Sequence, residues 1–397
     1  MKKITSRNAA TAFIAILLFV ISPILSLPVN TIFYIFDKSK KRILYSILIG
    51  ISLGIISYYF IPKVGYDLIK HQNIVLALKG MTFGEVISVS GKLDLEIIPV
   101  IYSYFVSFLS NIDLLQFFVV SAGYGILLYL LSDYRSRVDL DPLTFLIVTL
   151  FVIFGFHTLY FISGLYCYIA FILFSLVFYC ETILNKSKVV ANMLYILLVF
   201  MHNSLALPVL ILFAIKLFKG RFNLRTMTIC LLIFIFAYYI IVFANSILDS
   251  PTLHRVLSMY NAYTLKNEHY KIYYSGYVFI IEISKLIVTL YFTIKNSVSN
   301  KKQLTHNYIL ALSFISVLMM TKARLAIRYI MIIQFIGIVP IMNELAKNKK
   351  EKIIYLMILI GLTVFYILFF ISIFKNQSFG NLFTDRFYDS IFTIFNK

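Results

Sequence analysis

Apolar runs separated by short, basic loops recur along the whole 397-residue chain. Only 13% of the residues are charged and 61% are hydrophobic, whereas a soluble domain needs about a quarter of its residues charged to cover its surface. Most of the chain therefore has no suitable environment except lipid. The sequence predicts an all-α, polytopic integral membrane protein that forms one domain over residues 1–397, with no soluble domain.

A spanning helix needs about 20 mainly apolar residues, and we count about twelve candidate spans, within a range of about 11 to 13. They cover residues 9–36, 43–61, 114–131, 143–161, 165–184, 189–201, 205–217, 226–244, 277–294, 308–320, 326–345 and 353–374. The first contains Pro23 and Pro28 but no signal-peptide cleavage site follows it, so we predict one membrane helix there. The pair 189–201 and 205–217 is short, about 20 Å per helix, and is expected to cross a thinned region or to line a cavity.

The basic residues predict the orientation of these helices. Six short alternating loops are dense in Lys and Arg, at residues 38–42, 135–137, 186–188, 216–225, 295–302 and 347–352. Such loops stay in the cytoplasm, so we predict both chain ends outside. This explains the net charge of +19 without a nucleic-acid partner. Lys2, Lys3 and Arg7 oppose the placement of the N-terminus, and a hairpin near Pro23 or in 97–110 would change the count.

The longer segments 62–112 and 245–276 are predicted on the outer side. Residues 97–110 are apolar but short, which favours an interfacial or re-entrant helix. In the tail 375–397, Phe or Ile recurs every four residues from Phe379 to Phe395. That spacing predicts an amphipathic helix on the outer face, and a disordered tail is the alternative.

The sequence contains no pattern typical of a metal or cofactor site. Cys167, Cys180 and Cys230 lie in apolar runs and match no metal-ligand or disulfide spacing. No zinc-protease, phosphate-binding or dinucleotide-binding motif occurs. We therefore predict neither a metal nor a cofactor.

Three cations, Lys322, Arg324 and Arg328, lie on the predicted outer side, where Lys and Arg are otherwise sparse. Tyr329 follows them. If a helix begins near Arg324, both arginines lie on one face because they are four residues apart. Such a pair can bind a diphosphate through bidentate guanidinium contacts. The alternative is that the cations reach to lipid headgroups.

Two further candidates for acid–base chemistry are polar residues at the ends of apolar runs. His202, with Ser204, lies at the tip of the short hairpin, where an imidazole is able to relay a proton. Asp67 begins the first outer segment, where a carboxylate acts as a base or simply caps a helix. Weaker substrate-binding candidates are Tyr329, Ser204, Glu96 and Arg255.

Glu282 and Lys285 are charged residues inside an otherwise apolar span. Their i, i+3 spacing predicts that they neutralise each other, and a cavity-lining role is the alternative.

The order of these features resembles that of EpsG-like proteins and of the related O-antigen polymerases of the Wzy type. The resemblance covers most of the chain. It rests on the following segments in chain order: Gly65 to Asp67, Glu96 before an apolar stretch, Phe161 to Phe178, the Lys-bearing loop, the helix end at His202 and Ser204, and Arg324 to Tyr329. Many relatives carry an Arg shortly after the position of Phe161, where this chain has Ser163 and Gly164, so its anion-binding role must be absent or supplied elsewhere, for example by Arg324 and Arg328.

The resemblance implies a glycosyltransferase of the bacterial inner membrane that polymerises undecaprenyl-diphosphate-linked oligosaccharide repeat units at the outer face. Tyr and Phe side chains would supply sugar-stacking surfaces. A chain-length regulator and a flippase would be partners in the same membrane.

In this mechanism Arg324 and Arg328 would bind the diphosphate, while His202 or Asp67 would take the proton of the acceptor hydroxyl.

Two alternative functions use the same lipid-linked substrate. A flippase should show internal repeats and charges in the middle of several spans, and we find only Glu282 and Lys285. An O-antigen ligase uses the same leaving group.

Overall fold

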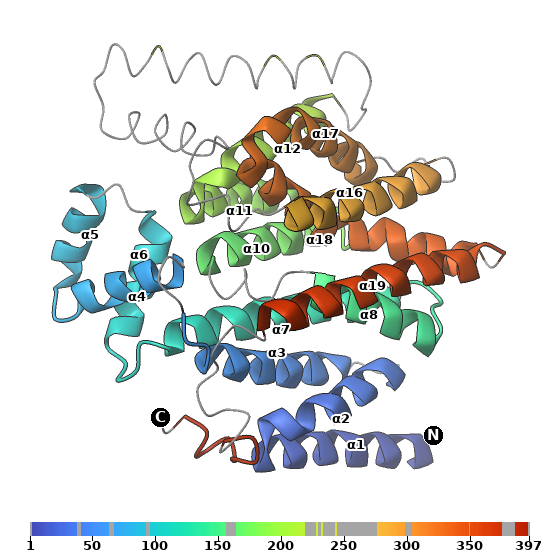
Figure 1. The fold of residues 1–397 in the computed structure, drawn as a ribbon, viewed down its shortest axis with the longest axis horizontal. Helices are drawn as coiled ribbons and strands as arrows, with labels where there is room; N and C mark the ends of the chain where they lie inside the picture. The colour runs from blue at the N-terminus through green and yellow to red at the C-terminus, as the bar shows by residue number, and fades with distance from the viewer. Residues whose placement is uncertain are drawn as a thin grey trace. The chain divides into compact units, whose positions relative to one another are not determined.

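The computed structural model describes residues 2–37, 41–62, 67–92, 96–155, 164–218, 276–297, 304–348, 350–374 and 386–395, together with the isolated helical residues 228, 232 and 243. These residues form helices and turns, with no strand among them, which confirms the all-α prediction for the described part (Figure 1). The chain divides into two compact units. Unit 1 comprises residues 1–86, 98–173 and 345–397, and unit 2 comprises 87–97 and 174–344. The prediction of one domain stays a prediction.

Unit 1 contains the N-terminal helices, the outer segment except residues 87–97, and the last helix. Its elements are α1 (Lys2–Ile21), α2 (Pro23–Phe36), α3 (Arg42–Tyr58), α4 (Asp67–Leu78), the first residues of α5 (Phe83–Lys92), most of α6 (Ile97–Ser107), α7 (Leu114–Arg135), α8 (Pro142–Gly155) and α19 (Lys352–Phe374). Helix α3 packs mainly against α7, and α19 packs against α8.

Unit 2 is built around the short hairpin. Its elements are α11 (Lys188–Met201), the 3-10 turn η1 (Asn203–Leu205), α12 (Ala206–Leu217), α16 (Gly276–Ser297), α17 (Leu304–Leu318), η2 (Met319–Lys322) and most of α18 (Ala323–Lys347). Helix α10 (Leu165–Thr182) contributes residues to both units. The predicted span 226–244 lies almost wholly outside the described residues, and the predicted outer loop 245–276 does so up to the first residue of α16.

Three helices are long and apolar enough to cross a membrane: α7, α10 and the Leu325–Lys347 part of α18. A further set of apolar helices among the described residues is only 10 to 17 residues long. The fold is therefore helical with three candidate spans, and the count of about twelve stays a prediction.

The last helix presents an apolar face outward. Ile353, Met357 and Leu368 of α19 are 60% or more exposed, whereas Leu359 and Tyr366 are buried. A continuous exposed face of large aliphatic side chains is unfavourable in water and stable in lipid. This face and the three long helices indicate a membrane protein.

The first predicted span is two helices rather than one. Helix α1 ends at Ile21, and Ser22 caps α2 by accepting a hydrogen bond from the Leu25 N–H group at 3.3 Å, with Pro23 at the first helical position. The Tyr45 hydroxyl group, near the start of α3, donates to Thr11 Oγ1 at 3.4 Å. The chain therefore turns back at Ser22, and the start of α1 lies at the end of unit 1 where α3 begins. The prediction of a single helix over 9–36 was wrong.

Three predicted inner loops meet at that same end of unit 1. Arg42 Nη1 donates to the Ser132 carbonyl oxygen at 3.1 Å, and Arg135 Nη1 donates to the Ile35 carbonyl oxygen. The Lys352 ammonium group, at the start of α19, contacts the Asp141 carboxylate. These three loops, which the basic residues assign to the cytoplasmic side, therefore lie together at one end of unit 1.

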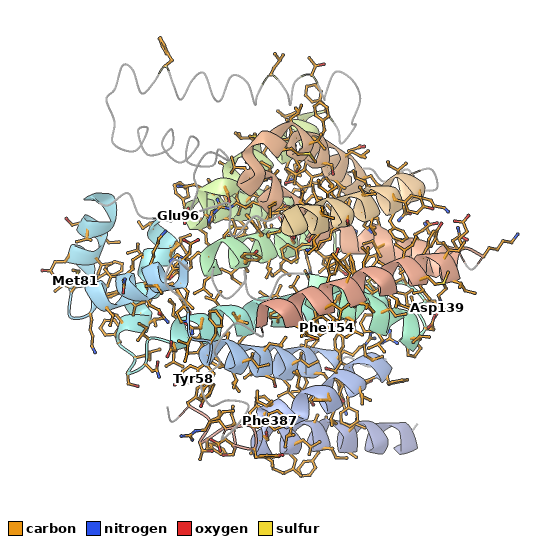
Figure 2. All side chains as sticks on the ribbon, in the orientation of Figure 1. Tyr58, Met81, Glu96, Asp139, Phe154 and Phe387 are labelled. Atoms are coloured by element: carbon orange, nitrogen blue, oxygen red, sulfur yellow. The ribbon has the colours of Figure 1, made fainter. Side chains whose placement is uncertain are left out.

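The C-terminal segment lies at the opposite end of unit 1. In Figure 2, Phe387 of this segment lies toward Tyr58 at the end of α3, whereas Asp139, just before α8, lies at the end where the basic loops meet. Residues 386–395 form turns, so the amphipathic helix predicted for 375–397 is wrong over this stretch, and 375–385 lie outside the described residues. Ile394 is fully buried in a cluster with Ile24, Ile55, Tyr58 and Tyr59. Tyr58 also donates to the Phe395 carbonyl oxygen at 3.0 Å. Phe387, Ile391 and Phe395 pack against this cluster, whereas Tyr388 and Phe392 are more than 70% exposed.

Candidate functional site

The α11–α12 hairpin forms as predicted, with its tip at His202. The backbone of His202 is extended, at φ −156° and ψ 115°, so α11 ends there and η1 begins. The His202 N–H group still donates to the Leu198 carbonyl oxygen at 3.0 Å, which completes the last turn of α11. A polar tripeptide between two apolar helices therefore presents its side chains at the end of the hairpin.

Glu96 approaches this tip from the outer segment (Figure 2). Its Oε1 atom accepts a hydrogen bond from the Asn203 N–H group at 2.9 Å and lies 4.0 Å from His202 Nδ1. The side chains of Glu96 and His202 are 23% and 13% exposed. The structure thus brings together two predicted site residues that are far apart in the sequence, and keeps both accessible.

Ser204 completes the cluster. Its hydroxyl oxygen lies 2.7 Å from His202 Nδ1, and its backbone N–H group donates to the same nitrogen at 3.2 Å. Because an amide N–H group only donates, Nδ1 acts as an acceptor and the neutral ring carries its proton on Nε2. The hydroxyl oxygen and the nearest carboxylate oxygen thus both lie on the Nδ1 side of the ring, where Nδ1 is able to accept the hydroxyl proton and the carboxylate to stabilise the imidazolium that forms.

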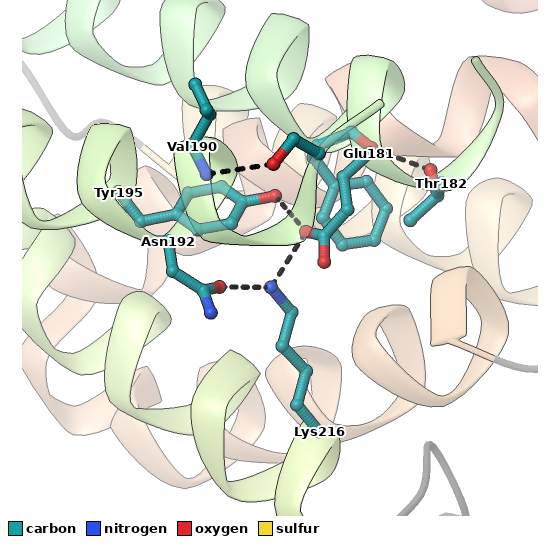
Figure 3. A network of polar contacts seen from close by, with 8 residues as sticks. Glu181, Thr182, Val190, Asn192, Tyr195 and Lys216 are labelled. Carbon is teal, nitrogen blue, oxygen red and sulfur yellow. Dashed lines mark hydrogen bonds and ion pairs between the residues drawn. The ribbon is translucent and has the colours of Figure 1, made fainter. Parts of the chain in front are cut away.

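A buried ion pair ties the other end of the hairpin to α10 (Figure 3). Lys216 Nζ lies 2.7 Å from Glu181 Oε2 and 2.7 Å from Asn192 Oδ1, and the Tyr195 hydroxyl group donates to the same Glu181 oxygen at 2.9 Å. The Glu181 side chain is 3% exposed and that of Lys216 is 19% exposed. Removing one partner of such a buried pair costs about 3–5 kcal/mol, so the pair fixes both hairpin helices to α10.

Sequence reasoning missed the role of Glu181 because that residue lies at the end of a predicted span. A carboxylate at a span end beside a Lys-bearing loop is the only sequence signal for this pair.

The predicted diphosphate-binding residues stand where α18 begins. Helix α18 starts at Ala323, three residues before the predicted span, which meets the condition for placing Arg324 and Arg328 one turn apart on one face. Lys322 ends the preceding turn η2. The side chains of Lys322 and Arg324 are outside the described set, and that of Arg328 is partly exposed. Tyr329 is 3% exposed and packs in the interior.

Asp67 belongs to unit 1, whereas His202 belongs to unit 2. It is in the first turn of α4 and forms an exposed ion pair with Lys70 at 3.2 Å. A carboxylate in the first turn stabilises the helix dipole, so this geometry matches the structural alternative for Asp67. The other weak candidate, Arg255, lies outside the described residues.

The charged pair inside α16 is neutralised as predicted. Lys285 Nζ lies 2.7 Å from Glu282 Oε1, and Gln334 of α18 donates to Glu282 Oε2 at 2.9 Å. Both charged side chains are at most 2% exposed. Each oxygen of the carboxylate thus has a donor, which explains why the charges are tolerated there.

Within the described ranges, no group of three or more His, Cys, Asp or Glu side chains is arranged to hold a metal ion. No known family model, curated protein or solved structure matches this chain.

Proposed function

We propose that this protein is a glycosyltransferase that polymerises polyprenyl-diphosphate-linked oligosaccharide repeat units at the outer face of a bacterial inner membrane. The observation that carries the proposal is the cluster of Glu96, His202 and Ser204 at the tip of the α11–α12 hairpin. The proposal includes about twelve membrane spans, a multi-pass topology with the basic loops inside, and a flippase and a chain-length regulator as partners.

In the proposed reaction an acceptor hydroxyl oxygen attacks the anomeric carbon of the donor. The bond between that carbon and the diphosphate oxygen breaks, and the lipid diphosphate leaves with the bonding electrons. The acceptor proton moves to Ser204 Oγ as the Ser204 hydroxyl proton moves to His202 Nδ1, 2.7 Å away. The Glu96 carboxylate, 4.0 Å from Nδ1, stabilises the resulting imidazolium.

Arg324 and Arg328 have the second role in the proposal, on the leaving group. Negative charge develops on the diphosphate as the glycosidic bond breaks, and fixed guanidinium groups stabilise it. The i, i+4 spacing at the start of α18 supports this role because one diphosphate has two phosphates to be contacted.

The test uses a strain that lacks the gene and receives one variant copy of it. The variants are His202→Ala, Ser204→Ala, and the double variant Arg324→Ala with Arg328→Ala. We expect each variant to lose long-chain polymer and to leave single repeats on the surface, since loss of an acid–base residue typically slows a reaction about 10²–10⁴-fold. Phe200→Leu is the control. Phe200 lies on the same helix, two residues before His202, and its apolar side chain is 55% exposed.

Chain-length ladders on gels separate the alternatives. Loss of every surface repeat on gene deletion would indicate a flippase, and polymer that accumulates on the carrier would indicate a ligase. Normal ladders in all the site variants would overturn the proposal.

A further inference from the structure

A second polar cluster lies in unit 1, at the end where α3 stops and α7 starts. It consists of Tyr58, His71, Gln72, Asn111, Asp113 and Tyr166, which we name the outer polar network. Hydrogen bonds join Tyr58, Gln72, Asn111 and Asp113, and the ring pair of His71 and Tyr166 adjoins them through α4, where His71 precedes Gln72. None of them belongs to the predicted catalytic set.

The centre of the network is a carboxylate held by side-chain amides. Gln72 Nε2 donates to Asp113 Oδ1 at 3.0 Å, and Gln116 Nε2 donates to the same oxygen at 3.4 Å. Asp113 is the N-cap residue of α7, yet its side chain makes no capping hydrogen bond. The carboxylate is instead turned toward Gln72 of α4.

Asn111 and Tyr58 extend the network. Asn111 Nδ2 donates to the Tyr58 hydroxyl oxygen at 2.6 Å, and Asn111 Oδ1 accepts from the Asp113 N–H group at 2.9 Å. Tyr58 is 1% exposed, whereas Gln72, Asn111 and Asp113 are partly exposed. The buried Tyr58 side chain therefore holds the Asn111 amide in place, while the amides of Asn111 and Gln72 stay accessible.

His71 supplies the sign that the network is incomplete. Its ring meets the Tyr166 ring edge-on, with 4.5 Å between the ring centroids, and its Nδ1 atom is buried with no hydrogen-bond partner in the part of the chain that the structure describes. Burial lowers the pKa of His71 to about 4, although Asp67 opposes the shift and Lys70 adds to it. The ring is therefore neutral at physiological pH and offers one donor and one acceptor. A buried polar atom without a partner is unfavourable until a ligand supplies one.

The chemistry of the network excludes most ligand classes. It contains no cation among its described side chains, which disfavours a phosphate or another anion. It contains a single carboxylate, too few ligands for a metal ion. Its surface of amides, carboxylate, imidazole and phenol offers both donors and acceptors beside aromatic rings, and a ligand dense in hydroxyl groups matches that combination.

We propose that the outer polar network binds the saccharide part of the lipid-linked substrate, as a glycan subsite separate from the catalytic cluster. This inference rests on the proposed function, because that function defines the glycan. Hydroxyl groups of the sugar contact Gln72, Asp113 and His71, and the apolar face of a ring lies against an aromatic side chain.

The test measures binding of a lipid-free probe to the full-length protein in lipid nanodiscs. The probe is the repeat-unit oligosaccharide released by mild acid from the surface polysaccharide of the source strain. Isothermal titration calorimetry and saturation-transfer NMR report binding to the wild type and to Gln72→Ala, Asp113→Asn and His71→Phe. We expect at least tenfold weaker binding in Gln72→Ala and His71→Phe and a smaller loss in Asp113→Asn, which keeps the shape of the side chain.

Asn73→Ala is the matched control, because Asn73 is an exposed amide next to Gln72 on another side of α4. It should bind like the wild type, and inorganic phosphate should not compete. Circular dichroism of each variant shows whether α4 is still folded, and Gln72→Ala, at a partly exposed position, keeps the test valid if Asp113→Asn fails to fold.

Two results would overturn the inference: no binding of the oligosaccharide by the wild type, or equal binding by the wild type and every folded network variant. His202→Ala separates this inference from the proposed function. If that variant binds glycan normally and makes normal polymer, the proposed function fails and the subsite remains. If polymer is lost in His202→Ala but the network variants bind normally, the subsite fails and the proposed function remains.

Discussion

His71 is a titratable side chain that the fold keeps neutral. Its Nδ1 atom is buried and its ring packs on Tyr166. Burial lowers its pKa from an ordinary value near 6.5 to about 4. Between these two values the unfolded chain binds a proton that the folded protein does not bind. The contribution of His71 to stability is therefore complete above about pH 6.5 and is lost as the pH falls toward 4.

His71→Gln should remove this part of the pH dependence. We expect the thermal midpoint of the wild type to fall between pH 7 and pH 5, at a rate of up to about 1.4 kcal/mol of stability per pH unit from this residue. The variant should be less stable than the wild type at pH 7, and the gap should narrow at pH 5. Circular dichroism in detergent measures both midpoints. Asn73→Ala should keep the slope of the wild type, and an unchanged slope in His71→Gln would contradict the prediction.

The proposed catalytic residues Glu96, His202 and Ser204 show which parts of a site the sequence predicts. His202 and Ser204 are predictable because they are polar residues between two apolar runs, where a helix must break. The contact of Glu96 with the hairpin is not predictable, since it joins residues 107 positions apart and has no local periodicity. The outer polar network was missed for the same reason, because Gln72 and Asp113 are 41 positions apart and neither stands out in its own segment.

At the scale of elements, two glycines of α3 allow this helix to approach α7 closely. A Cβ atom at Gly50 would lie 2.7 Å from the Ser121 carbonyl oxygen and 2.9 Å from the Gly125 nitrogen of α7, and one at Gly54 would lie 2.8 Å from the Phe117 carbonyl oxygen. Backbone atoms cannot move aside without moving the helix. Small residues four positions apart allow membrane helices to approach in this way.

Gly50→Ala should therefore destabilise unit 1 by about 1–3 kcal/mol through overpacking. Gly125→Ala is the matched control on the facing helix, because a Cβ atom there would meet its nearest neighbour, the Ser46 carbonyl oxygen, at 3.9 Å. The thermal midpoint should drop for Gly50→Ala and hardly change for Gly125→Ala. Equal midpoints in the two variants would show that α3 and α7 are not this tightly packed.

The hairpin of α1 and α2 shows why helix boundaries are hard to predict inside apolar sequence. A turn in a soluble protein is marked by a polar stretch, but this turn contains only Ser22 as a polar residue and keeps its carbonyl and N–H groups bonded within unit 1. Ser22 Oγ donates to the Phe387 carbonyl oxygen at 2.8 Å, and the Ile391 N–H group donates to the Val20 carbonyl oxygen at 3.1 Å. The C-terminal segment thus completes the turn, and hydrophobicity alone could not reveal it.

At the scale of the whole molecule, the α1–α2 hairpin changes the expected topology. It places the start of α1 at the end of unit 1 where the loops before α3, α8 and α19 meet. Lys2, Lys3 and Arg7 belong to the start of α1, so the hairpin assigns them to the same end of unit 1 as these three loops. The difficulty that these three cations raise for an outer N-terminus disappears, and the charge pattern and the fold agree.

We therefore expect the N-terminus inside and the C-terminus outside, instead of both outside. Single cysteines at Ser6, Lys79, Asn348 and Ser390, in a variant without native cysteines, test this in intact cells with a membrane-impermeant maleimide. Lys79→Cys and Ser390→Cys should react at once, while Ser6→Cys and Asn348→Cys should react only after the membrane is opened. Because Ser6 and Ser390 lie in segments at opposite ends of unit 1, labelling of both in intact cells would contradict the hairpin. Labelling of Ser6→Cys and Asn348→Cys, with Lys79→Cys and Ser390→Cys protected, would show the reverse orientation.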